Sequence, residues 1–224
     1  TYTDKYYNTQ DLENVMIIPE AYQLNDDSRD AFYGSYDFEK TAQQAILETQ
    51  KLKRAVGKLV LKEKQQVAYT QSASFTVSYN VPKSFNVATG STRSADVHAV
   101  TANDQNLAGN ADSQDYTIFY DYIFATTGDG GYSISGLSLT GEDSQGATFT
   151  KDGIPNLPVH QNKRTIVSGS YMLVAPLPDG PSVKVETEIT DTWADADVTV
   201  DTDEDVKPDV PAFAGKGTQG EPFQ

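Results

Sequence analysis

Apolar and polar residues alternate along several stretches of the chain, and a period of two predicts β-strands. The stretch FTVSYNV has one mainly apolar face, formed by Phe75, Val77, Tyr79 and Val81. The stretch VKVETEITDTW also has one, formed by Val183, Val185, Thr187, Ile189 and Trp193. Each stretch is therefore expected to be a strand with one buried face and one polar face.

The stretch YTIFYDYIFA, residues 116–125, is apolar on both faces. Strands that are covered on both sides have this composition, so it is predicted to be a central strand of a sheet. Turn-forming residues recur between the apolar stretches, at 127–131, 141–146, 151–153 and 177–181. Their spacing is typical of β-sandwiches. The sequence thus predicts an all-β fold, with a Greek-key sandwich of seven or eight strands over residues 67–193.

The first 66 residues are richer in loops and contain only short apolar pieces. Near Ala45 the pattern fits a helical face, and near Leu59 it fits a strand. We expect a short helical turn near Arg54 that runs into this strand. The segment is too short and irregular for a sandwich of its own. It either packs on the domain that follows or belongs to a domain that lacks strands.

The end of the chain, residues 194–224, contains eight acidic residues and two lysines. This composition favours an extended tail. Ala196, Val198 and Val200 nevertheless continue the period of two, so part of the tail could pair with a sheet edge. We therefore expect three parts: residues 1–66, a sandwich over residues 67–193, and the tail 194–224.

The charge and the composition exclude several classes of function. With 32 acidic and 17 basic residues, the chain has a formal net charge of −15, and no nucleic-acid partner is expected because phosphate binding needs concentrated Lys and Arg. It has no cysteine, which excludes disulfides, thiolate metal sites and cysteine nucleophiles. It also lacks a long apolar run and a signal peptide. We expect a soluble chain, or one that begins after a removed leader.

His98 and His160 are the only histidines, and the motifs HExxH and GxSxG are absent. Neither histidine has the spacing of a metal site or of a nucleophile and its base. We expect both to be structural, and we predict no catalytic residue, no metal site and no cofactor. Residues 156–173, NLPVHQNKRTIVSGSYML, are then interpreted as a crossing loop that leads into a strand over residues 165–174. In that strand Gly169 permits a bulge or a close backbone approach.

Two clusters of charged residues have features of binding sites. Asp201, Asp203 and Asp205 have the spacing of a calcium loop, but Val206 and Ala212 stand where such a loop needs Gly and Glu. A solvated acidic tail fits the sequence better. Six basic residues lie between positions 51 and 64 without interleaved aromatic residues. They are expected to form a solvated strand face or to pair with acidic loops, and not to bind phosphate or a membrane.

Four stretches occur in the order of a known family pattern: YYNTQDLENVMI, DDSRDAFYG, LKRAVGKLVLK and LPVHQNKRTIVSGSYML. With them, the chain resembles the fimbrillin-like proteins of Bacteroidia, the subunits of type V pili, from Tyr6 to Leu173. The resemblance implies transthyretin-like β-sandwich domains, with residues 1–66 as a portion of the N-terminal domain. It also implies an exported lipoprotein at the cell surface, on the fimbria or the outer membrane. Since the chain has no cysteine, any lipid anchor is expected to lie outside it.

The resemblance further implies a structural subunit of a fimbria that supports adhesion or biofilm formation and is assembled by donor-strand exchange with neighbouring subunits. In this mechanism a donated strand satisfies the open backbone groups of a groove, and its alternate side chains fill the core. A tail that packs on its own domain, or stays disordered, is the alternative. The tail positions that suit a donor strand are Ala196, Val198, Val200, Val206, Val210 and Phe213.

A second hypothesis is a tip or accessory adhesin, or a surface lipoprotein, that binds a glycan or a host protein through the loops of the sandwich. Aromatic loop residues would then be exposed. The candidates are Tyr33, Tyr36, Phe38 and Tyr132.

Overall fold

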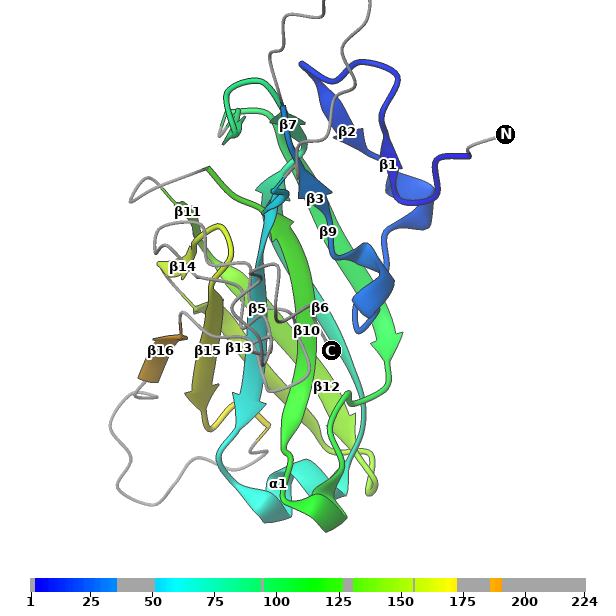
Figure 1. Cartoon of the computed structure of the whole chain (residues 1–224). Coiled ribbons are helices and arrows are strands. Elements are labelled where there is room, and N and C mark those ends of the chain that lie inside the picture. The colour runs from blue at the N-terminus through cyan, green and yellow to red at the C-terminus, as the bar shows by residue number, and fades with distance from the viewer. Residues whose placement is uncertain are drawn as a thin grey trace, which may run out of the picture.

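The computed structural model describes residues 3–35, 51–93, 95–126, 131–154, 156–172 and 186–190, and two four-stranded sheets dominate them (Figure 1). The first sheet is antiparallel, in the order β13 (Thr148–Ile154), β12 (Leu137–Asp143), β6 (Ser72–Pro82) and β9 (Val97–Gln105). The second has the order β10 (Thr117–Phe124), β5 (Val56–Glu63), β15 (Arg164–Gly169) and β16 (Glu186–Thr190). In it, β15 runs parallel to β5, and the other pairs are antiparallel. The predicted all-β sandwich is confirmed.

Three smaller sheets and a few short helices complete the described part of the chain. One sheet has the order β1 (Tyr7–Asn8), β2 (Val15–Ile17), β7 (Ser84–Asn86) and β8 (Ser91–Thr92). The two others pair β3 (Phe32–Tyr33) with β4 (Lys53–Arg54), and β11 (Tyr132–Ile134) with β14 (Leu157–Val159). The helix α1 (Gln66–Gln71) connects β5 to β6, and the 3-10 helices are η1 (Pro19–Ala21), η2 (Asp27–Arg29) and η3 (Ala111–Ser113).

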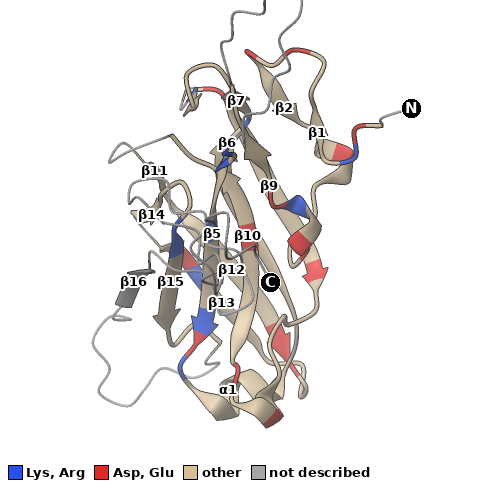
Figure 2. Cartoon of the chain, in the orientation of Figure 1, with Lys and Arg blue, Asp and Glu red and all other residues tan. Residues whose placement is uncertain are grey.

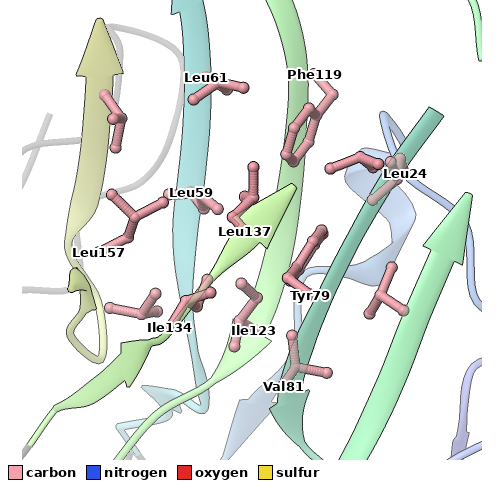
Figure 3. Packing of buried hydrophobic residues seen from close by; sticks show 14 of the residues in the cluster. Leu24, Leu59, Leu61, Tyr79, Val81, Phe119, Ile123, Ile134, Leu137 and Leu157 are labelled. Carbon is pink, nitrogen blue, oxygen red and sulfur yellow. The ribbon is translucent and has the colours of Figure 1, made fainter. Parts of the chain in front are cut away.

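The core lies between the two large sheets (Figure 3). On β6 the predicted alternation is confirmed, because Phe75, Val77, Tyr79 and Val81 are buried whereas Asn80 is exposed. The ring centroids of Phe75 and Tyr79 lie 5.9 Å and 6.0 Å from that of Phe119 on β10. These stacked rings join the two sheets, since β6 and β10 belong to different ones.

The predicted central position of residues 116–125 is not observed, because β10 is the last strand of its sheet among the residues that the structure describes. The strand is nevertheless buried on both faces, since loops replace the missing neighbour. The main-chain N–H of Asn25 donates to the carbonyl oxygen of Tyr120 at 3.0 Å, and the Asn25 side-chain oxygen accepts from the Tyr120 N–H at 2.9 Å. The N–H groups of Ala108 and Gly109 donate to carbonyl oxygens of residues 118 and 117. The sequence pattern thus detected the burial but not the edge.

Two local predictions are also wrong. The segment at Arg54 is the strand β4 instead of a helical turn, because Lys53 and Arg54 pair with Tyr33 and Phe32. Residues 151–153 lie inside β13, where the register with β12 shifts between Leu137 and Leu139. Gly153 has a φ of 65° there, so the glycine belongs to a bulge and not to a turn.

The strand pairing crosses the expected boundary at residue 66, since β5 lies between β10 and β15. The division into parts at residues 66 and 193 stays a prediction. The expected helical face near Ala45 lies outside the described residues. For the predicted strand at 183–193, the structure describes β16 over residues 186–190.

Residues 156–172 carry the chain from β14, which pairs with β11, into β15, which pairs with β5. A turn joins the two strands: the Lys163 N–H donates to the His160 carbonyl oxygen at 3.2 Å, and Asn162 has a φ of 58°. The Asn162 N–H donates to the Val56 carbonyl oxygen at 3.0 Å, which anchors the turn to β5. The Tyr171 ring packs on Gly169, where an added Cβ would lie 2.6 Å from the ring. The stretch therefore closes the fold as predicted, but the strand β15 ends at Gly169, before the predicted end at Val174.

A buried ion pair fixes the N-terminal segment to the sandwich. Arg29 and Asp121 are each 1% exposed, and the Arg29 Nη1 bonds to Asp121 Oδ1. The other carboxylate oxygen, Oδ2, accepts hydrogen bonds from the hydroxyl groups of Tyr22 at 2.5 Å and Tyr79 at 2.6 Å. The guanidinium also donates to the carbonyl oxygen of Tyr122 at 3.0 Å. The pair thus joins the loop before β3 to both large sheets.

The protonation of this cluster follows from its burial. Burial raises the pKa of Tyr22 and Tyr79 well above its usual value, and the charge of Asp121 raises it further. Burial lowers the pKa of Arg29, but the Asp121 carboxylate outweighs this effect and the net pKa is raised. The hydroxyls therefore stay neutral donors and the guanidinium stays charged.

We expect Asp121→Asn to lower the free energy of unfolding by about 3–5 kcal/mol, because it leaves Arg29 buried without a counter-charge. Denaturant-induced unfolding followed by circular dichroism measures the loss. Asp115→Asn is the matched control, since its ion pair with Lys62 is 45% and 38% exposed and such pairs contribute about 0–1 kcal/mol. Equal losses in the two variants would contradict a special role of the buried pair.

The buried tyrosines also predict a loss of stability in alkali. Their folded-state pKa lies above the ordinary value of 10.0, so at high pH the unfolded chain releases protons that the folded chain retains. The contribution of the protonated tyrosines to the free energy of unfolding is complete below pH 10.0. It is lost as the pH rises toward their folded-state pKa. Tyrosinate absorbance and circular dichroism, recorded in one titration, should change together. Full ionisation of the tyrosines with an intact fold would refute the prediction.

Candidate functional site

Three exposed hydrophobic side chains gather around one cavity near the N-terminus. Leu12, Phe32 and Leu52 are 57%, 44% and 49% exposed, and all three line a cavity of about 640 Å³. Large apolar side chains that cluster on a surface mark interaction sites more often than chance exposure does. We call this cavity the aromatic groove.

Four aromatic rings form the floor of the aromatic groove. The Phe124 ring centroid lies 4.9 Å from that of Tyr7 and 5.5 Å from that of Phe85. The Tyr33 ring meets Phe85 edge-on at 4.8 Å. These rings come from β1, β3, β7 and β10, so strands that are far apart in the sequence build one apolar surface.

The wall of the groove is held by a charged pair. Arg54 donates hydrogen bonds to the carboxylate of Asp30 from Nε at 2.8 Å and from Nη2 at 2.7 Å. Its guanidinium lies 4.8 Å from the centre of the Phe32 ring. Bidentate hydrogen bonds of this kind fix the orientation of the two side chains as well as the distance between them. The exposed Phe32 is therefore presented by a rigid support.

Two strand edges border the aromatic groove. Among the described residues, β1 pairs only with β2, and β3 pairs only with β4. Tyr7 of β1 and Tyr33 of β3 both line the cavity. The groove therefore combines an apolar floor with two short strands that each have one strand partner among the described residues.

A second, more polar groove of about 650 Å³ follows β9, which is the last strand of the first sheet among the described residues. Tyr22 and Leu24 line one side and His98 and Val100 the other. The rings of Tyr22 and His98 lie 5.0 Å apart. Burial lowers the pKa of His98, and the charge of Arg29 lowers it further.

The sequence-predicted site residues have different outcomes. The donor positions Ala196, Val198, Val200, Val206, Val210 and Phe213 lie outside the described residues, as do Tyr36 and Phe38. Tyr33 and Tyr132 are half-buried. Of the basic residues between positions 51 and 64, three pair with acidic loop residues: Arg54 with Asp30, Lys58 with Asp27, and Lys62 with Asp115. That expectation is confirmed for these three.

The described residues include no group of three or more His, Asp or Glu side chains that could hold a metal ion. Nor does any helix among them have the length and hydropathy that a membrane-spanning helix needs.

Residues 1–208 match the family of unknown function DUF6562. The chain belongs to this family. None of the curated proteins matches it.

Among solved structures, the chain is similar to a candidate cell adhesion protein from Bacteroides uniformis ATCC 8492, with 15% identity and a TM-score of 0.34 over 64% of this chain and 53% of that one. This DUF6562 chain thus corresponds to about half of that protein's length. It is also similar to a structure of the sugar-binding protein pneumolysin, with 14% identity and a TM-score of 0.25 over 63% of this chain and 25% of that one. Both TM-scores are too low to support an argument about function.

Sequence reasoning missed the aromatic groove. Leu12 and Leu52 stand singly among polar neighbours, and Phe32 lies between Ala31 and Tyr33. No periodic pattern distinguishes the three from apolar residues that pack inward. The available signal was weak: all three lie within stretches that carried the family resemblance. Only their meeting in space reveals the site.

We expect Leu52→Ser to reduce the fluorescence of a bound environment-sensitive dye such as anilinonaphthalene sulfonate, because it removes part of the rim of the groove. Stability should change by no more than about 0.5 kcal/mol, since the side chain is exposed. Val67→Ser is the control, because Val67 is 65% exposed on α1 outside the groove. An equal loss of fluorescence in both variants would show that the dye does not report on the groove.

Proposed function

We propose that this protein is a structural subunit of a cell-surface fimbria, assembled by donor-strand exchange. The observation that carries the proposal is the aromatic groove, where the exposed side chains of Leu12, Phe32 and Leu52 line one cavity with residues of the short strands β1 and β3. Burying one such side chain contributes about 1.5–3 kcal/mol. A strand from a neighbouring subunit would cover all three and would satisfy the backbone groups at the edges.

The donor in this proposal is the tail of the neighbouring subunit. Ala196, Val198 and Val200 fall on one face of an extended chain, and Asp195, Asp197 and Asp201 fall on the other. A strand of this kind can bury its apolar face while the carboxylates stay in water. Export to the cell surface and a lipid anchor outside the chain belong to the same proposal, which rests on the family resemblance of the sequence.

The second candidate is an adhesin that binds a small apolar or glycan ligand in the aromatic groove. The volume of about 640 Å³ favours it, since ligand pockets measure about 300–1,000 Å³. The half-buried state of Tyr33 and Tyr132 argues against recognition by splayed loop aromatics: the Tyr33 ring packs on Phe85, and the Tyr132 hydroxyl donates to the Asn80 carbonyl oxygen at 3.2 Å. Strand exchange is therefore the function that the described residues favour.

A mixing experiment tests strand exchange. A chain that lacks residues 194–224 keeps the groove but has no donor, whereas Leu52→Glu keeps the donor but places a charge in the groove. Each variant alone should remain monomeric, and an equal mixture should form heterodimers and nothing longer, as read by size-exclusion chromatography and electron microscopy. Wild-type chains should form ladders and filaments.

Val67→Glu is the matched control and should assemble like the wild type, because Val67 lies outside the groove. Multimers of the tail-deleted chain would rule out the tail as donor. Multimers of Leu52→Glu would rule out the aromatic groove as acceptor. A glycan array probed with the monomer distinguishes the adhesin from the fimbrial subunit. The adhesin should bind a glycan and should not form a ladder of multimers.

A further inference from the structure

The charges in and around the aromatic groove balance one another. Two charged side chains line it, Lys5 and Asp30, and Arg54 binds the Asp30 carboxylate through two nitrogen atoms. The sequence neighbours of Leu12 and Leu52 on the rim are exposed charged residues, two acidic and two basic: Asp11, Glu13, Lys51 and Lys53. Figure 2 likewise shows side chains of both signs close to β1. The groove therefore favours an occupant without charge.

The floor of the groove favours an aromatic ring over a smaller side chain. Phe85 stacks on Phe124 with 5.5 Å between the ring centroids, and Tyr33 meets Phe85 edge-on. Both arrangements are ones that aromatic rings prefer. The Phe32 ring is 44% exposed although the Arg54 guanidinium lies beside it, so part of that ring is open to a further contact. A ring that enters the groove has aromatic partners below it and at its side.

One stretch of the tail combines an aromatic ring with a lack of charge. Residues 194–224 contain two aromatic residues, Phe213 and Phe223. Phe213 lies in VPAFAG, residues 210–215, which are six consecutive uncharged residues, whereas Phe223 is two positions from Glu221. Residues 195–205 contain six carboxylates, and bringing these into an apolar groove costs free energy. The stretch around Phe213 is thus the part of the tail that suits the groove.

The length of the chain allows Phe213 to reach a second molecule. The described residues end at Thr190 in β16, and Phe213 is 23 positions further along, a span of up to about 76 Å when extended. Pro211 has no N–H to donate to a neighbouring strand. The strands β1 and β3 beside the groove have two residues each. Side chains must therefore carry more of this contact than backbone hydrogen bonds do.

We propose that residues 210–215 of a second copy of this chain fill the aromatic groove, with the Phe213 ring on its floor. The inference rests on the proposed fimbrial function and deepens it, because it assigns the anchor of the donor to one side chain. The acidic stretch 195–205 then stays outside the groove, where its carboxylates remain in water.

Two serine variants of the full-length chain test this anchor. Phe213→Ser should raise the dissociation constant between subunits roughly 10- to 150-fold, the change expected when one buried phenylalanine side chain is lost. Phe223→Ser is the matched control, since it makes the same change in the same tail, and it should assemble like the wild type. Sedimentation of each variant over a range of concentrations measures the constants. Equal effects of the two substitutions would overturn the assignment of Phe213.

Cross-linking tests where the segment lies, because the chain has no cysteine. Ser28 is exposed and lines the groove. The double variant Ser28→Cys with Ala214→Cys, treated with a short bismaleimide, should give a covalent ladder of multimers. Ser28→Cys with Thr202→Cys is the comparison and should give much less. Equal yields from the two pairs would overturn the proposed segment, and cross-links confined to single chains would overturn a second copy as its source.

The two proposals fail in different experiments. If Phe213→Ser assembles like the wild type while the chain without residues 194–224 stays monomeric, the anchor is wrong and strand exchange stands. If the chain without residues 194–224 still forms multimers, strand exchange by the tail is wrong, and the anchor is wrong with it.

Discussion

The fold depends on the buried ion pair between Arg29 and Asp121. Removing two charges from water costs several kcal/mol each, and the pair is tolerated only where hydrogen bonds satisfy the remaining atoms. Tyr22 and Tyr79 supply these bonds to the carboxylate, and the Tyr122 carbonyl oxygen accepts from the guanidinium. These hydrogen bonds and the ion pair must form together, so the segment before β3 is an integral part of the sandwich. It is the part that makes an acidic residue at the centre of β10 possible.

This constraint also decides which sheet edges stay open. The ion pair holds the loop that contains Asn25 along β10, and the Asn25 side chain and backbone bond to both polar groups of Tyr120. The edge of β10 is thus closed without a strand, which removes a site for uncontrolled pairing. Among the described residues, the strands beside the aromatic groove that have a single partner are β1 and β3, which have two residues each. Growth at such short edges needs apolar side chains as well as backbone bonds, and Leu12, Phe32 and Leu52 offer them.

The sequence predicted what depends on neighbouring residues and missed what depends on distant ones. The alternation at Phe75 to Val81 is local, and it gave both the strand and its buried face. The stretch 116–125 gave burial but not the edge position, because a loop far away in the sequence covers it. Gly153 signalled a positive φ, but a bulge and a turn use glycine in the same way. Arg29 stands among acidic residues like a surface residue, and its partner is 92 positions away. The aromatic groove was not predicted because its rim also depends on distant residues, which come from three separate segments of the chain.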